Sequence, residues 1–282
     1  MSRIDFLICG NIRLTKQFRF KEIKIPSLNG YDLPGWLVLA KENKDHDPKK
    51  GKGVVILVHG GGVDRRELTR YLPFYLELGY DTISFDLSCH GESPCLVPGL
   101  SFGNIETRDV LSVYLYVKKI YKNIFMFGSS VGGSSILIAL PFLNDVKGVV
   151  VENPMISFDR IILDSPESNK LPNKMITSLI ELVKIRGKFD SMWSPKNSLH
   201  LVSDSPIFMI HSKNDKVVSY KHSESLLFEN RGSIENLYGA IPYMGQWHHF
   251  REKIRFWHRA FCRREGDGNS VEVRLVQGSH SN

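Results

Sequence analysis

NIFMFGSSVGG, residues 123–133, is the stretch that decides the fold. Residues 123–128, which contain the apolar run 124–127, predict a strand. The run 131–142 that follows predicts a helix. Gly128, Ser130 and Gly132 fit the pattern G-x-S-x-G, which is typical of a serine exposed at a sharp strand-to-helix turn. Bulky side chains two positions from that serine would clash, so the turn needs both glycines.

A serine in such a turn is a candidate nucleophile. The N-terminus of the following helix directs backbone N–H groups and a positive dipole end toward it. The N–H of Val131 is therefore a candidate donor to an oxyanion. The pattern is short, and two alternative interpretations of the same residues remain: a structural strand-to-helix turn rich in glycine and serine, or a phosphate-binding turn.

Strand-like and helical runs alternate on both sides of this stretch. Further buried strands are predicted at 53–58, 81–86, 148–153 and 206–211. Helices are predicted between them at 65–78 and 106–121, and Pro73 predicts a kink or a later start in the first of these. An antiparallel pair, 18–25 and 36–40, precedes them. This alternation is typical of an α/β fold with a mostly parallel twisted sheet and helices on both faces.

The alternation breaks at residues 154–205, which contain no strand-like run but one amphipathic helix, 175–186. We expect this segment to form a small helical cap over the carboxyl ends of the strands, where open α/β sheets bind ligands. We treat 1–282 as a single domain whose tail, 265–282, has no predicted structure.

Composition narrows the class of protein. The 282 residues are 42 % apolar, and 37 Lys and Arg against 30 Asp and Glu give a net charge of +7, which is typical of a globular protein and excludes a mainly disordered one. The basic clusters at 41–52 and 251–264 belong to no nucleic-acid-binding motif, so we expect solvated faces and no nucleic-acid partner; attraction to lipid headgroups stays open.

Membrane spans and secretion signals are not predicted from the sequence. No run reaches the roughly 18 apolar residues that a membrane span needs, and the N-terminal apolar run, 6–9, is too short for a secretory signal. The four cysteines form no disulfide framework. We therefore expect a cytoplasmic protein with reduced thiols.

Three further motifs lie at predicted strand ends: HGGG at 59–62, DLSCHGES at 86–93 and HSKNDKVV at 211–218. Together with the serine turn, and in this order, they resemble the α/β-hydrolase fold serine hydrolases, in the branch of small esterases and prolyl-oligopeptidase-like enzymes. The resemblance covers residues 18–264. Departures are Ser212, where glycine is common, and Ser88-Cys89, where the family often has Arg-Gly.

The resemblance implies a catalytic triad in the chain order serine, acid, histidine. Asp215, just past the strand 206–211, is the expected acid, and Glu152 at the end of the preceding strand is the alternative. The expected base is His248, which lies in GQWHHF between a predicted last strand and a last helix. His249 and His280 remain alternatives for the base.

The expected function follows from these assignments. Ser130 attacks the carbonyl of a small acyl substrate, and the N–H groups of Gly61 and Val131 stabilise the oxyanion, while His59 orients the loop that contains Gly61. No cofactor and no metal are expected. The sequence favours cleavage of an ester or thioester; a peptidase acting on short peptides, or a non-catalytic homologue that binds a ligand or partner, remains an alternative.

Overall fold

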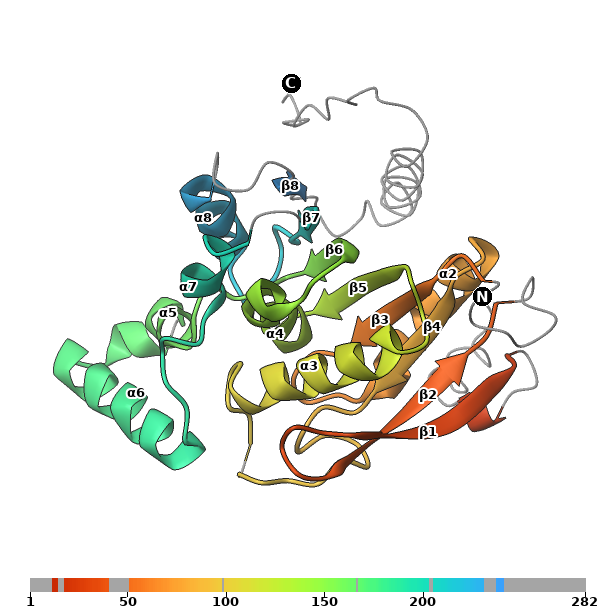
Figure 1. The fold of residues 1–282 in the computed structure, drawn as a ribbon. Coiled ribbons are helices and arrows are strands. Elements are labelled where there is room, and N and C mark those ends of the chain that lie inside the picture. Colours follow the sequence, from red (N-terminus) through yellow and green to blue (C-terminus); the bar gives the residue numbers. More distant parts are fainter. Residues whose placement is uncertain are drawn as a thin grey trace, which may run out of the picture.

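The computed structural model describes residues 12–14, 18–40, 51–97, 99–165, 167–202, 205–230 and 237–240. Eight strands form one sheet in the order β1-β2-β4-β3-β5-β6-β7-β8 (Figure 1). They are β1 Phe20–Pro26, β2 Asp32–Val38, β3 Val54–Val58, β4 Asp81–Phe85, β5 Ile124–Ser129, β6 Val146–Glu152, β7 Ile207–Ile210 and β8 Leu237–Ala240.

The sheet is antiparallel at one edge and parallel over the rest. Strand β1 pairs with β2, and β2 with β4, in antiparallel register. All pairs from β4 to β8 are parallel. This confirms the predicted mostly parallel sheet, and it brings the carboxyl ends of β3, β5, β6 and β7 to one edge.

Helices cover both faces of this sheet, as predicted. The described helical elements are η1 Ile12–Leu14, η2 Arg65–Tyr71, α2 Leu72–Glu77, α3 Ile105–Lys118, α4 Val131–Ala139, η3 Leu140–Phe142, α5 Phe158–Asp164, η4 Ser168–Lys170, α6 Asn173–Gly187, α7 Pro195–Leu199 and α8 Lys221–Glu229. The predicted helix 65–78 is divided, because Pro73 lies in the first turn of α2 and η2 precedes it.

Two buried clusters show how the strands share their side chains between the faces. Ile56 of β3 packs with α3 and α4 on one face, whereas its neighbours Val55 and Leu57 pack with η2 and α2 on the other. This alternation is the side-chain period of a strand that is covered on both sides.

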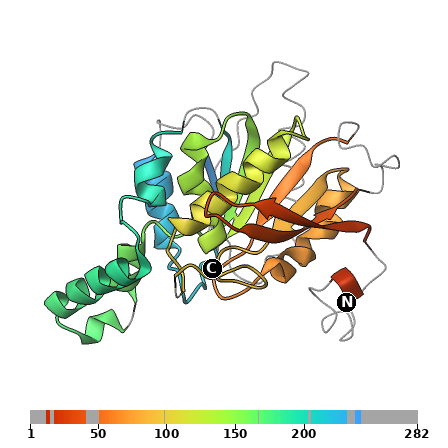
Figure 2. The same ribbon diagram turned by 60° about the horizontal axis from the view of Figure 1, so that its bottom comes forward.

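The segment between β6 and β7 is helical, with α5, η4, α6 and α7 in its described part. Helices α5 and α6 project from the body of the molecule in both views (Figures 1 and 2). We call residues 154–205 the helical insertion. Its start lies close to the serine turn, because Met155 and Ile161 pack in one cluster with Val131. The division into one domain with a cap and a tail stays a prediction, and residues 265–282 lie outside the described residues.

Candidate active site

The serine turn joins β5 to α4. Ser130 is the N-cap of α4 with φ 51° and ψ −118°, a sparsely populated backbone conformation for a residue with a side chain. The N–H of Ser130 donates to the carbonyl of Glu152 (2.7 Å), and the N–H of Ser134 donates to the carbonyl of Ser130 (2.9 Å). The turn is thus fixed from both sides, with Ser130 half-buried and its neighbour Ser129 buried.

Both glycines of the turn are required by close packing. A Cβ atom on Gly128 would lie 2.7 Å from the backbone nitrogen of Gly133. On Gly132 it would lie 2.3 Å from the carbonyl oxygen of His59 and 2.5 Å from that of Val58. The sequence-based requirement for glycine at both positions is therefore confirmed by the space available.

A buried histidine holds the loop 59–62 that faces the serine. His59 Nδ1 donates to the carbonyl of Gly60 (2.7 Å), and its Nε2 accepts from the N–H of Leu87 (2.9 Å). Burial lowers the pKa of His59 to about 4, so the ring is neutral near pH 7 and matches these donor and acceptor roles. His59 thus ties this loop to the end of β4.

A second histidine, His90, contacts the same loop. Its Nε2 accepts from the N–H of Gly62 (3.0 Å), and its Nδ1 donates to the carbonyl of Ser88 (2.8 Å). The ring centroids of His59 and His90 lie 5.1 Å apart. The sequence analysis missed this role; the available signal was a histidine beside a glycine in the turn 86–93.

The loop brings Gly61 next to the nucleophile turn. A Cβ atom on Gly61 would lie 3.2 Å from Val131 Cγ2 and 2.8 Å from Leu100 Cδ1. A Cβ on Gly60 would lie 3.4 Å from the Cβ of Ser130. Gly61 and Val131, the two predicted oxyanion donors, therefore lie beside Ser130; their catalytic role stays a prediction.

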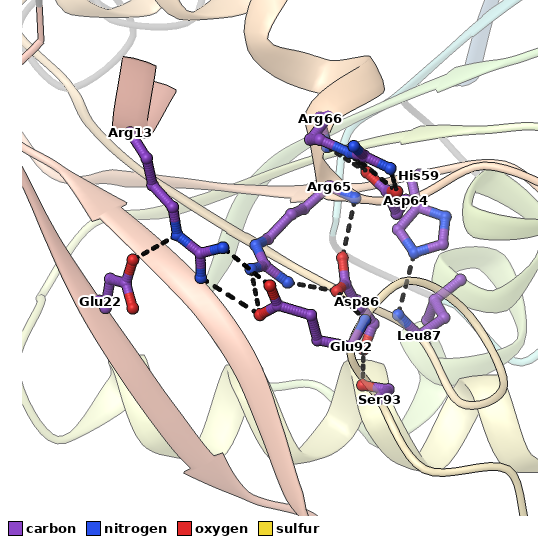
Figure 3. Close-up of polar contacts among 10 residues, drawn as sticks. All are labelled: Arg13, Glu22, His59, Asp64, Arg65, Arg66, Asp86, Leu87, Glu92 and Ser93. Atoms are coloured by element: carbon purple, nitrogen blue, oxygen red, sulfur yellow. Dashed lines mark hydrogen bonds and ion pairs between the residues drawn. The ribbon is translucent and has the colours of Figure 1, made fainter. Parts of the chain in front are cut away.

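An ion-pair network fixes the loop 86–93 against the start of η2 (Figure 3). Arg65 is buried and pairs with buried Asp86, and its second Nη lies 2.6 Å from Glu92. Arg13 reaches the same carboxylate (2.7 Å). Hydrogen bonds from Arg13 and Arg65 lower the pKa of Glu92 to about 2. The network holds the turn that carries His90, and so supports Gly62 indirectly.

Cys89 and Cys95, in and beside the same turn, form a disulfide. The prediction of reduced thiols is therefore wrong for this pair. The physical reason is the turn itself: the N–H of Cys89 donates to the carbonyl of Pro94 (2.9 Å), which folds the six-residue segment back on itself. The cytoplasmic location stays a prediction.

The predicted acid, Asp215, lies in the loop after β7. Its Oδ1 accepts the N–H groups of Val217 (2.8 Å) and Val218 (2.9 Å). Val218 packs with Val131 and Met155, which places this loop beside the serine turn. Within the described residues Oδ2 accepts no hydrogen bond, and the role of Asp215 as the acid stays a prediction.

Buried polar contacts fix the acid loop. His211 Nε2 donates to the carbonyl of Val218 (2.8 Å), and its Nδ1 accepts from Ser223 (2.7 Å). Burial lowers the pKa of His211 and favours the neutral ring. The N–H of Ser212 donates to Asn153 Oδ1 (2.9 Å), and Ser212 is not among the residues with positive φ, so serine is tolerated here in place of glycine.

The alternative acid, Glu152, has other partners. It is buried at the end of β6, where Tyr71 donates to its Oε2 (2.9 Å) and an Arg70 Nη lies 3.8 Å away. Burial raises the pKa of Glu152. These contacts hold its carboxyl group against η2. The backbone carbonyl of the same residue accepts the hydrogen bond from the N–H of Ser130.

The candidate bases His248, His249 and His280 lie outside the described residues. His222, in contrast, is described and buried in α8. Its Nδ1 accepts from the N–H of Ile156 (3.2 Å), and its Nε2 lies 3.3 Å from Asp164. Both ring nitrogens are thus engaged with the helical insertion.

A pocket of about 500 Å³ opens beside the loop 59–62. It is lined by residues 62–64, 89–91, 99, 100 and 102, so it lies between that loop and the segment before α3.

No group of three metal-binding side chains occurs in the part of the chain that the structure describes. None of the described helices is long and apolar enough to cross a bilayer.

Three known proteins illustrate what the chain is similar to. An uncharacterized protein of Bacillus subtilis, YqkD, is 24 % identical over 243 residues, which cover 82 % of this chain and 76 % of YqkD. The esterase Pf2001 of Pyrococcus furiosus superposes with a TM-score of 0.65 at 19 % identity, covering 88 % of this chain and 91 % of the esterase. The acylaminoacyl peptidase of Pyrococcus horikoshii gives a TM-score of 0.67 at 16 % identity, covering 96 % of this chain and 45 % of the peptidase.

At these identities the two solved structures establish the fold alone. The model of one sequence family matches residues 55–218, more than half of the chain, from β3 through the acid loop. The matched part includes the loop 59–62, the turn 86–93, the serine turn and Asp215. The protein belongs to the alpha/beta hydrolase family.

Proposed function

We propose that the protein is a serine hydrolase that cleaves carboxylic esters with Ser130 as nucleophile, Asp215 as acid and His248 as base. The observation that carries the proposal is the backbone of Ser130, held at φ 51° beside Gly61 and Val131. Strained backbone of this kind persists only where surrounding contacts enforce it, and it concentrates at functional sites.

Each of the proposed site residues has its own step in the reaction. Ser130 Oγ attacks the carbonyl carbon of the ester while the imidazole of His248 takes its proton and then delivers it to the leaving alkoxide. The N–H groups of Gly61 and Val131 donate to the oxyanion of the tetrahedral intermediate. Water then attacks the acyl-enzyme by the same route and releases the acid.

Asp215 is the better of the two candidate acids. Its Oδ1 is fixed by two backbone N–H groups, and its Oδ2 remains for the Nδ1–H of a histidine. Glu152 already accepts from Tyr71 and is buried beneath the turn. We therefore assign Glu152 a supporting role and Asp215 the orienting role.

The test is labelling with a fluorophosphonate, which phosphonylates an activated serine, followed by peptide mapping of the modified residue. We expect wild type to be labelled at Ser130 and Ser130→Ala to be unlabelled. The matched control is Ser129→Ala, which removes the neighbouring hydroxyl and keeps labelling. Equal labelling of wild type and Ser130→Ala would refute the proposal.

Hydrolysis of p-nitrophenyl acetate by His248→Ala, His249→Ala and His280→Ala identifies the base. We expect His248→Ala alone to lose activity. A panel of blocked dipeptides in the same assay separates an esterase from a peptidase of short peptides. Full activity in all three variants would refute the proposed catalytic triad. Absence of hydrolysis by wild type would favour the alternative of a non-catalytic binding protein.

A further inference from the structure

Helix α6 of the insertion carries apolar side chains on two faces. Ile176 and Ile180 are buried with Phe158 and Phe189, which fixes the inner face. The other apolar side chains are exposed: Met175 by 51 %, Leu179 by 46 %, Leu182 by 59 %, Val183 by 40 % and Ile185 by 75 %. The burial of the inner face therefore leaves a second apolar face in contact with water.

Three of these residues form one line along the helix. Met175, Leu179 and Leu182 follow at intervals of four and three, which places them on one side of α6. We call these three residues the outer stripe. In both views α6 stands at the far end of the insertion, away from the sheet (Figures 1 and 2). A helix of this length is about 22 Å long, so the stripe presents an extended apolar edge.

Basic side chains lie at both ends of the stripe. The exposed ones are Lys170, Lys174, Arg186 and Lys188. None of the four forms an ion pair with a described residue, whereas Lys184 on the inner side pairs with Asp159 and Glu181. The cations beside the stripe thus remain available for an external negative partner.

The position of Lys174 gives a second reason to look for such a partner. It lies in the first turn of α6, which contains no acidic residue. A cation near a helix N-terminus opposes the helix dipole. Lys174 therefore does not stabilise its own helix, and its charge is available for interaction outside it.

The charge distribution argues against pairing of α6 with a second copy. A parallel two-fold pairing would bring identical ends together, and an antiparallel one would bring the Lys174 end against the Arg186 end. Both arrangements set cations against cations, which is unfavourable. An anionic lipid bilayer, in contrast, offers an apolar layer to the stripe and negative headgroups to both ends.

We propose that the helical insertion docks on an anionic lipid bilayer, with the outer stripe of α6 at the acyl boundary and the cations at both helix ends among the headgroups. The contact is peripheral and lies in the plane of the interface. It is independent of the hydrolase activity, because it uses no residue of the serine turn or the acid loop.

Co-sedimentation of the full chain with vesicles tests this docking. We expect wild type to bind vesicles of phosphatidylcholine with phosphatidylglycerol and to bind pure phosphatidylcholine weakly. Leu179→Ser with Leu182→Ser should reduce the partition coefficient by about tenfold or more, because the stripe is lost. Lys174→Gln with Arg186→Gln should reduce binding to the anionic vesicles by about tenfold and leave binding to neutral vesicles unchanged.

Matched controls alter the same residue types elsewhere. Phe228→Ser removes a side chain that is 75 % exposed on α8, and Lys21→Gln with Lys24→Gln removes exposed charges on β1. Both should keep wild-type binding. The proposal is overturned if wild type binds neither vesicle or if the controls lose as much binding as the α6 variants. A dimer that the stripe variant dissociates, with vesicle binding unchanged, would overturn it in favour of a second copy.

Discussion

The loop 59–62 and the helical insertion are held in opposite ways. Polar contacts fix the loop: His59 and His90 each use both ring nitrogens, and a buried arginine pairs with Asp86 behind them. The core of the insertion around α6 is a small apolar cluster, and much of the apolar surface of α6 faces water. Directional contacts fix atoms for chemistry, whereas a small apolar cluster fixes a helix less tightly.

The largest effect on stability is expected from adding a side chain at Gly132 in the serine turn. Gly132→Ala should lower the free energy of unfolding by about 4 kcal/mol and abolish labelling of Ser130, because its Cβ meets two backbone carbonyls. Urea unfolding measures the loss. Gly30→Ala is the control: its φ is 87° but nothing lies within 4 Å, so about 1 kcal/mol is expected. Equal losses of unfolding free energy in the two variants would show that steric crowding at Gly132 does not determine the stability of the turn.

The second effect is a pH dependence from His59. Its pKa is about 4 in the folded protein and about 6.5 when unfolded, so the unfolded state binds more protons between these values. Stability therefore falls as the pH drops from about 6.5 to 4, by up to about 3 kcal/mol from this residue. His59→Gln should reduce the slope of unfolding free energy against pH in that window. An unchanged slope would assign the dependence to other groups.

The third prediction tests whether the helical insertion unfolds independently of the sheet. Ile180→Ala removes a buried side chain from the small cluster and should destabilise the insertion by about 2 kcal/mol. Hydrogen exchange should then accelerate in α5 and α6 and stay unchanged in β3 and β5, because the insertion opens separately. Leu182→Ala, at an exposed position, is the control and should change neither. Faster exchange throughout the sheet would mean that the two regions unfold together.

The smallest effect on stability is expected at His90. His90→Ala leaves the N–H of Gly62 without its acceptor, but Gly62 is exposed and water replaces the contact, so about 1 kcal/mol is lost. The kcat of the proposed esterase reaction should nevertheless fall by about tenfold, because the proposed oxyanion donor at Gly61 loses its position. Steady-state kinetics and thermal unfolding give the two values. His90→Gln, which retains an acceptor, should recover part of kcat, and a loss of stability without loss of kcat would contradict a positioning role.

Local patterns predicted the parts of the site that lie within one segment. The strand before Ser130, the helix after it and the two glycines of the turn depend on neighbouring residues only, and the structure confirms them. The helical character of the insertion was also predictable. Its packing was not, because the same apolar pattern includes both buried Ile180 and exposed Leu179.

The sequence by itself determined the order of strands and helices, the serine turn and the loops at the strand ends, since hydrophobic period and glycine placement act over a few residues. The tertiary structure alone decided that His90 holds Gly62, that Val218 packs on Val131, and that Cys89 meets Cys95. It also decided which face of α6 meets the solvent. The physical reason is that these contacts depend on how the chain returns on itself in three dimensions, which no local period records.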